Sequence, residues 1–204
     1  MTRPRFWTRF RSALAALGVL SAAVGVIALA VPANASAAPQ AAPAASAMTK
    51  VVQYATAIRN GHSEHGWRGG KVPYSWDGGH GAKPGPTLGS CVGYTGSIHP
   101  CPADKTVGTD CSGFVRWVYD LAIGHDVLGP GSTNDELATG HLHKTAKPQP
   151  GDLVYYGSST TNTHHVGIYI GGGKMIDALE TGTNVETDSV QAASDLLGYF
   201  HYTA

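Results

Sequence analysis

The sequence predicts an α+β domain in which helices come first and an antiparallel β-sheet follows. Helical periodicity is found in residues 48–60 and 111–123, and a cap signal begins a short helix at Ser132. From residue 150 onward, short runs of β-branched and aromatic residues alternate with glycine-rich or polar turns. We therefore expect N-terminal helices packed on a central antiparallel sheet.

Residues 1–37 have the pattern of a secretory signal peptide. An arginine-bearing start precedes an apolar run over residues 13–31, and the small residues that follow fit the cleavage pattern, so we expect cleavage after Ala37. The alternative is an uncleaved membrane anchor, because the run approaches the length that spans a bilayer. The segment before this apolar run contains no adjacent arginine pair, which argues against export by the twin-arginine pathway. We expect a secreted mature protein without membrane attachment.

Residues 38–47 are rich in alanine and proline and predict a disordered linker, so the folded domain is expected over residues 48–204. The chain has a formal net charge of zero. Removing the four arginines of the first segment leaves ten basic residues against fourteen acidic ones, a net charge of −4. This balance excludes a strongly basic surface for nucleic acid. We expect no nucleic-acid partner and a monomer.

The three cysteines, Cys91, Cys101 and Cys111, predict one disulfide and one free thiol. Secretion permits disulfides, and an odd count leaves one thiol over. Cys91 and Cys101 flank a loop rich in glycine, serine and proline, and closing it stabilises the fold by about 2–3 kcal/mol in the chain-entropy model. We therefore pair these two and leave Cys111 free. A thiol kept free in an oxidising compartment favours a catalytic role.

Cys111 lies in the first turn of the helix predicted over residues 111–123. Asp110 is suited to cap the free backbone donors there, Phe114 begins a buried stripe at helical spacing, and Gly124 is suited to end the helix. A helix N-terminus favours the thiolate, which is the nucleophilic form of cysteine. The alternative is an ordinary buried cysteine, since inert buried thiols are common.

The helix predicted over residues 48–60 is followed by a polar, glycine-rich segment. His62 and His65 flank Glu64 there, which invites a metal site. The spacing places no third ligand, so we expect no metal and no other cofactor.

The aromatic segment over residues 72–79 has two open interpretations. It is either a structural turn with packed aromatic rings or the wall of a pocket, with the Tyr74 hydroxyl directed at the site. Residues 80–109 are predicted to form a loop over their whole length. A connection this long is typical of functional or disordered segments. The predicted disulfide favours an ordered loop.

The short helix from Ser132 to about residue 139 is followed by a polar loop that contains His141 and His143. Beyond it, β-branched and aromatic residues predict the strands of the sheet. These strands are expected over residues 153–157, 164–170, 174–179, 184–187 and 198–202.

The glycines at residues 171–173 predict a tight hairpin, and its register decides which side chains meet. A three-residue loop places His165 and Asp177 on one face as diagonal neighbours, whereas a two-residue loop places them on opposite faces. In the first register Asp177 accepts from one ring nitrogen of His165, and the other nitrogen is free for a thiol. His164 alternates to the opposite face and is expected to be structural or a rim residue.

Four segments resemble motifs of the NlpC-type cell-wall cysteine peptidases, which are papain-like peptidoglycan endopeptidases, and they occur in that family's order. The segments are YSWDGG at 74–79, DCSGFV at 110–115, PGDLVY at 150–155 and HVGIYIG at 165–171. The resemblance covers residues 48–204. It implies a papain-like α+β fold of the NlpC type and hydrolysis of peptidoglycan stem peptides by a bacterial protein at the cell wall.

The same resemblance implies a role for each motif residue. Cys111 corresponds to the nucleophile and His165 to the general base. Tyr74 is implied to stand near the thiol and shape the oxyanion or substrate site. Asp110 and Ser112, which flank the nucleophile, are implied to bind the peptide. The expected reaction is thiolate attack on a peptide carbonyl, followed by hydrolysis of a thioester.

The chain departs from the family pattern at two places. Asp177 stands where the family most often has histidine, with asparagine or glutamine as variants; a carboxylate orients an imidazole and favours a thiolate–imidazolium pair. The link between Gly79 and Asp110 is much longer than usual and contains the predicted disulfide. We interpret it as a stapled flap near the cleft that affects substrate specificity.

Other functions are compatible with the same residues. An amidase or an acyltransferase on this fold would use the same cysteine and histidine. A catalytically silent module that binds the wall would need the fold but not the catalytic residues. The presence of both Cys111 and His165 argues against such a module.

Overall fold

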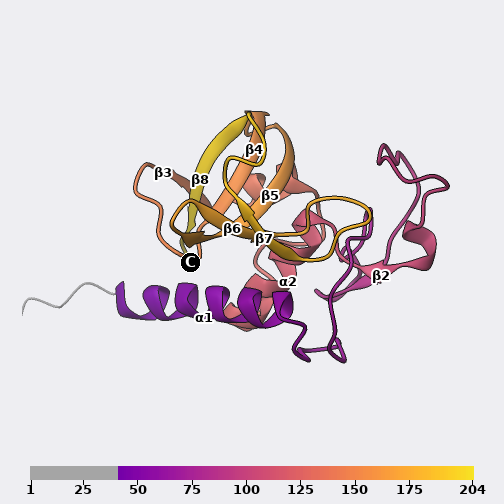
Figure 1. Ribbon diagram of the computed structural model, residues 1–204. Helices are drawn as coiled ribbons and strands as arrows, with labels where there is room; N and C mark the ends of the chain where they lie inside the picture. The colour runs from indigo at the N-terminus through magenta and orange to yellow at the C-terminus, as the bar shows by residue number, and fades with distance from the viewer. Residues whose placement is uncertain (1–40) are drawn as a thin grey trace, which may run out of the picture. The chain divides into compact units, whose positions relative to one another are not determined.

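The computed structural model describes residues 41–204, and the predicted signal peptide lies outside them. Three α-helices precede or flank a six-stranded antiparallel sheet, which confirms the predicted α+β class (Figure 1). The helices are α1 (Ala41–Arg59), α2 (Cys111–Ile123) and α3 (Thr133–Ala138), and a 3₁₀ turn covers Ala103–Lys105.

The large sheet has the strand order β3-β8-β4-β5-β6-β7, and each neighbouring pair is antiparallel. Its strands are β3 (Leu142–Thr145), β4 (Leu153–Ser159), β5 (Asn162–Gly171), β6 (Lys174–Asp177), β7 (Glu186–Ser189) and β8 (Leu196–Tyr202). β3, at one edge of the sheet, includes His143, where the sequence predicted a polar loop.

α1 begins at Ala41, several residues before the expected start of the folded domain at Met48. The prediction of a disordered linker up to residue 47 is therefore wrong for residues 41–47. The physical reason is that an alanine-rich segment has a high helix propensity and extends a helix that is already packed. Pro43 lies in the first turn, where no intrahelical N–H bond is lost.

α2 is the helix on which the site depends, and its caps are those expected from the sequence. The Asp110 carboxylate accepts from the Gly113 N–H at 2.8 Å, and Gly124 ends the helix with a left-handed φ of 93°. Phe114 and Val118 are fully buried, as the predicted stripe requires. In Figure 1 α2 lies beside α1 at the sheet, and its residues pack against both α1 and β5.

Alternation along the strands builds two apolar clusters on the two faces of the sheet. Leu153, Tyr155 and Ile168 belong to the main core with α1 and α2. Tyr156 and Met175, which point the other way, belong to a smaller cluster. The alternate positions of one strand therefore serve different faces of the sheet.

The hairpin between β5 and β6 differs in detail from the prediction. The turn has only Gly172 and Gly173 between the strands, but a register shift between Tyr169 and Gly171 inserts one extra residue. This bulge restores the register that the three-residue loop predicted, because Ile168 pairs with Ile176. His165 and Asp177 therefore share a face.

The segment over residues 80–109 is mostly loop, with one small pairing of β1 (Thr87–Leu88) and β2 (Val107–Gly108). A disulfide joins Cys91 and Cys101, with their Cα atoms 5.9 Å apart, and Cys111 is a free cysteine. Both observations agree with the predicted pairing. Among residues 41–204, no helix is long and apolar enough to cross a membrane.

Candidate active site

Cys111 is the first residue of α2, and two glycines allow this helix end to pack against the turn at residues 78–79. The Asp110 N–H donates to the Gly78 carbonyl at 2.9 Å. A Cβ on Gly79 would lie 2.6 Å from the Gly113 Cα, and one on Gly113 would lie 2.8 Å from the Gly79 Cα. Only glycine at both positions permits this approach, which explains the glycines in the YSWDGG and DCSGFV motifs.

The thiol of Cys111 is free and buried, and its surroundings act on its pKa in both directions. Burial raises the pKa of Cys111 well above its ordinary value, and the negative charge of Asp110 raises it further. Backbone N–H groups of Val166 and Ser112 oppose this rise. Burial thus acts on the pKa of Cys111 against the helix N-terminus, which the sequence analysis expected to favour the thiolate.

His165 on β5 and Asp177 at the end of β6 form a buried pair. The His165 Nε2 lies 2.7 Å from the Asp177 Oδ2, and Asp177 is fully buried. The carboxylate accepts, so Nε2 carries the hydrogen and Nδ1 is left as the basic nitrogen of a neutral imidazole. This is the contact that the hairpin register predicted.

The structure brings the thiol next to the strand that carries His165. The backbone N–H of Val166, the residue after His165, acts to lower the pKa of the Cys111 thiol, as a nearby donor does. α2, which begins at Cys111, packs against β5 and β6, the strands that carry His165 and Asp177. A nucleophile, a base and an orienting carboxylate are the groups that acyl transfer requires.

Tyr74 is held beside this helix end by backbone pairing. The Tyr74–Thr109 bridge runs parallel, and the Ser75 N–H donates to the Thr109 carbonyl at 3.0 Å. Burial, together with the nearby Cys111 and Asp110, raises the pKa of Tyr74 above its ordinary value. The hydroxyl thus stays protonated and can donate a hydrogen bond, which favours the pocket-wall interpretation over a purely structural turn.

A cleft of about 350 Å³ lies along these residues. Tyr74 and His165 line it, and Thr95 and Gly96 contribute from the disulfide-closed loop. The remaining lining residues are Trp76, His164, Leu179, Glu180, Thr181 and Ala193. The predicted position of the 80–109 insertion near the cleft is confirmed.

The insertion is fixed to the cleft wall through Trp76. The Trp76 Nε1–H donates to the Val92 carbonyl at 3.2 Å, and the Trp76 and Tyr94 rings meet edge to face with centroids 5.5 Å apart. The Ser90 N–H also donates to the Trp76 carbonyl at 2.9 Å. We call the disulfide-closed residues 91–101 the flap.

Asp110 and Ser112 flank Cys111, and their polar side-chain groups already have partners. The Ser112 hydroxyl donates to the Asp110 Oδ1 at 3.1 Å, and the His80 Nε2 lies 2.8 Å from the Asp110 Oδ2. Although burial acts in the opposite direction, the bond to Asp110 leaves the pKa of His80 raised. Sequence reasoning missed His80, because no spacing in a long loop places it against Asp110.

Two buried charged residues near α2 were also missed. Arg116 donates from Nη1 to the carbonyls of Gly79 and Gly81 at 3.0 and 2.9 Å, and from Nη2 to Asp126 at 2.7 Å. Glu136 of α3 is fully buried and accepts from the Tyr155 hydroxyl at 2.8 Å. Burial raises the pKa of Glu136 well above its ordinary value. An otherwise apolar helix pattern gives no sign that its one arginine faces inward.

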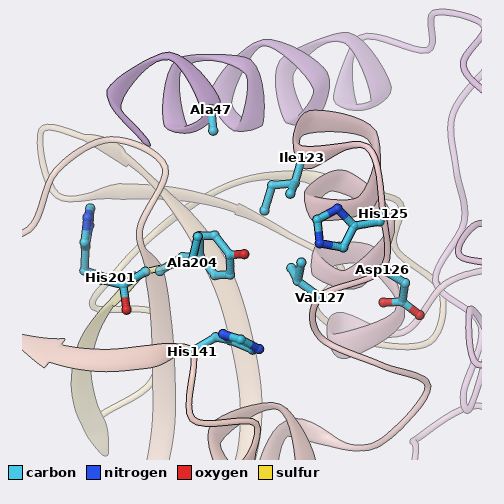
Figure 2. A pocket seen from close by; sticks show the side chains of 10 residues that line it. Ala47, Ile123, His125, Asp126, Val127, His141, His201 and Ala204 are labelled. Carbon is cyan, nitrogen blue, oxygen red and sulfur yellow. The ribbon is translucent and has the colours of Figure 1, made fainter. Parts of the chain in front are cut away.

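A larger cavity of about 750 Å³ lies at the other end of α2, among Ile123, His125, His141 and the C-terminal residues (Figure 2). The twelve steps along α2 from Cys111 to Ile123 correspond to about 18 Å. This cavity is therefore separate from the cysteine. Across residues 41–204, no three His, Cys, Asp or Glu side chains are grouped to hold a metal ion.

A cysteine at a helix start beside a histidine-bearing strand of an antiparallel sheet is the arrangement of the papain-like α+β proteins. A model of the NlpC/P60 family matches residues 70–196, more than half of the sequence, and the chain belongs to this family. The resemblance read from the four motifs is thereby confirmed.

The curated relatives and solved structures agree with this assignment. Peptidoglycan endopeptidase RipB of Mycobacterium tuberculosis is 33% identical over 144 residues, 71% of this chain and 50% of RipB. Peptidoglycan endopeptidase RipA of the same species is 33% identical over 136 residues, 67% of this chain and 24% of RipA. The chain thus spans between a quarter and a half of the length of these relatives.

Among solved structures, that of the peptidoglycan hydrolase RipB has a TM-score of 0.56 at 28% identity, covering 85% of this chain and 72% of that one. RipD from Mycobacterium tuberculosis, described as a non-catalytic NlpC/p60 domain protein adapted to peptidoglycan binding, has a TM-score of 0.54 at 25% identity. The match covers 78% of this chain and 98% of RipD.

Proposed function

We propose that this chain is a secreted cysteine-type endopeptidase that hydrolyses peptide bonds in peptidoglycan stem peptides. The observation that carries the proposal is the buried His165–Asp177 pair at 2.7 Å on β5 and β6, the strands against which the helix that begins at Cys111 packs. The names of RipA and RipB support peptidoglycan as the substrate.

In the proposed reaction His165 takes the thiol proton as the Cys111 sulfur attacks the peptide carbonyl. Because burial raises the pKa of Cys111, proton transfer accompanies attack and does not precede substrate binding. Backbone N–H groups at the start of α2 and the Tyr74 hydroxyl are the donors proposed for the oxyanion. His165 then protonates the leaving amine, and water hydrolyses the thioester.

The motif match implied that Asp110 and Ser112 bind the peptide, whereas in this proposal they have a structural role. Their mutual hydrogen bond, and the contact of Asp110 with His80, hold the first turn of α2 in place. The peptide is bound by the cleft that Tyr74 and the flap line.

A wall-binding role without catalysis is the second candidate, because RipD has this fold and is described as non-catalytic. Retention of Cys111 on a helix that packs against the strands of the His165–Asp177 pair favours catalysis. An amidase or acyltransferase would use the same three residues, and the identity of the product separates these reactions.

The test is digestion of purified peptidoglycan by the secreted protein, followed by mass analysis of the muropeptides. An endopeptidase releases products that end within the stem peptide, with one water added per bond cleaved. Release of intact stem peptides from the sugar would identify an amidase. Binding to the wall with no new product would identify a silent binding module.

A further inference from the structure

Asp177 has a second carboxyl neighbour that the reaction described above does not use. Its Oδ2 faces His165, while its Oδ1 is buried and has no hydrogen-bond partner among residues 41–204. The Oδ2 of Asp188 on β7 is likewise buried and has no hydrogen-bond partner among these residues. Two buried carboxyl oxygens that lack donors need an explanation, since such groups are nearly always paired.

The register of the sheet places these two side chains together. Asp177 pairs with Glu186, and Met175 pairs with Asp188, so Asp177 and Asp188 are diagonal neighbours on one face. The two oxygens without a partner, Oδ1 of Asp177 and Oδ2 of Asp188, therefore belong to carboxyl groups that are neighbours on adjacent strands. Two ionised carboxylates have no hydrogen to share, whereas a proton on one of them would let these two oxygens pair.

Within residues 41–204, no other side chain donates a hydrogen to these two oxygens. On β4 the Tyr156 hydroxyl, which faces the pair, donates to the Val190 carbonyl at 3.0 Å. Asp195, also close to Tyr156, is 2.6 Å from His164 Nε2. On β5 His165 already donates to the other oxygen of Asp177.

We propose that Asp188 is a positioning residue that donates its carboxyl proton to the Asp177 Oδ1 and so fixes the acceptor of His165. The inference rests on the proposed function. The Asp188–Asp177 pair carries a single negative charge, and Asp177 is held with Oδ2 toward the imidazole. Burial, and the neighbouring Asp177, raise the pKa of Asp188, consistent with its being the member that keeps the proton.

The proposal predicts different effects for two replacements of Asp188. Asp188→Asn retains an N–H donor toward Asp177 and should keep kcat within about threefold of the wild type. Asp188→Ala removes the donor and should lower kcat by about tenfold or more with little change in KM. Glu186→Gln is the matched control, because it removes an exposed carboxylate from the same strand.

Rescue of kcat by asparagine but not by alanine supports a positioning role. Wild-type kcat in Asp188→Ala, with the folded state checked by circular dichroism, overturns it. Loss of activity in Asp188→Asn equal to that in Asp188→Ala also overturns it, since the donor alone should suffice.

A second measurement does not depend on turnover. The side-chain carboxyl carbon of Asp188, assigned by its absence in Asp188→Asn, is titrated by NMR in the wild type and in Asp177→Asn. The proposal predicts titration above the usual aspartate range of about 3.9 in the wild type and at a lower pH when Asp177 is neutralised. Titration at the same pH in both proteins overturns it. A wild-type protein that cleaves no peptidoglycan overturns the proposed function, while this titration still decides whether the two carboxyls share a proton.

Discussion

His165 and Asp177 lie 2.7 Å apart, between Nε2 and Oδ2, on one face of the sheet although the turn between their strands has only two residues. The bulge before Gly171 compensates for the short turn. One extra residue in β5 moves every preceding side chain of that strand to the opposite face of the sheet. This relation leaves Nδ1 of His165 available to the thiol.

Replacing Asp177 tests that orienting contact. Asp177→Ala removes the acceptor of Nε2–H, and we expect kcat to fall by about 100-fold or more, the range that general-base catalysis contributes. Asp177→Asn keeps an acceptor oxygen and should lose less. Steady-state hydrolysis of a stem peptide measures both, and an alanine variant as active as the asparagine variant would contradict the orienting role.

Replacing Gly113 tests the close approach at the start of α2. In Gly113→Ala the added methyl group collides with the turn at residues 78–79, and overpacking of this kind costs about 1–3 kcal/mol. Urea unfolding measures the loss in free energy of unfolding. An unchanged midpoint would mean that the turn moves aside freely, and the account of the two glycine motifs would fail.

The sequence predicted those features whose cause lies within a few residues. The caps at Asp110 and Gly124 and the strand alternation around His165 follow from local backbone chemistry, and the structure has them as expected. The disulfide followed from the composition of the loop between Cys91 and Cys101. The hairpin register was right although its turn was wrong, because burial of one face constrains register more strongly than loop length does.

The features that the sequence did not predict depend on contacts between distant segments. Arg116 is buried only because the carbonyls at Gly79 and Gly81, more than thirty residues away, converge on it. His80 meets Asp110 through a loop of irregular conformation. The burial of Cys111, which reverses the expected effect of the helix end on its pKa, is likewise set by tertiary packing.

Glu136 predicts a dependence of stability on pH. Burial raises its pKa in the folded state, so its contribution is fully present below the unfolded glutamate pKa of about 4.3 and is lost as pH rises through the folded value. Glu136→Gln keeps an acceptor for the Tyr155 hydroxyl without titrating. We expect the Tm of this variant to exceed that of the wild type by a margin that grows with pH.

Differential scanning calorimetry across this pH range measures the margin, with the exposed Glu186→Gln as control. A margin that shrinks as pH rises would contradict a raised pKa for Glu136. A similar trend in the control would assign the effect to overall charge and not to the buried carboxyl.

The flap predicts separate effects on stability and on substrate affinity. The double variant Cys91→Ser/Cys101→Ser opens the loop, and we expect the free energy of unfolding to fall by about 2–3 kcal/mol. Thr95 and Gly96 line the cleft, so KM should rise more than kcat falls. An unchanged KM in the folded double variant would show that the flap does not contact the substrate.

The central claim is that the Cys111 sulfur attacks the peptide, and replacing that one atom tests it most directly. The measurement is release of peptide fragments from purified peptidoglycan by wild-type protein, by Cys111→Ala and by Cys91→Ser/Cys101→Ser, each checked for folding. The account predicts that Cys111→Ala releases nothing above the blank while the double variant, which keeps this thiol, still cleaves. Release by Cys111→Ala at the wild-type rate would contradict it.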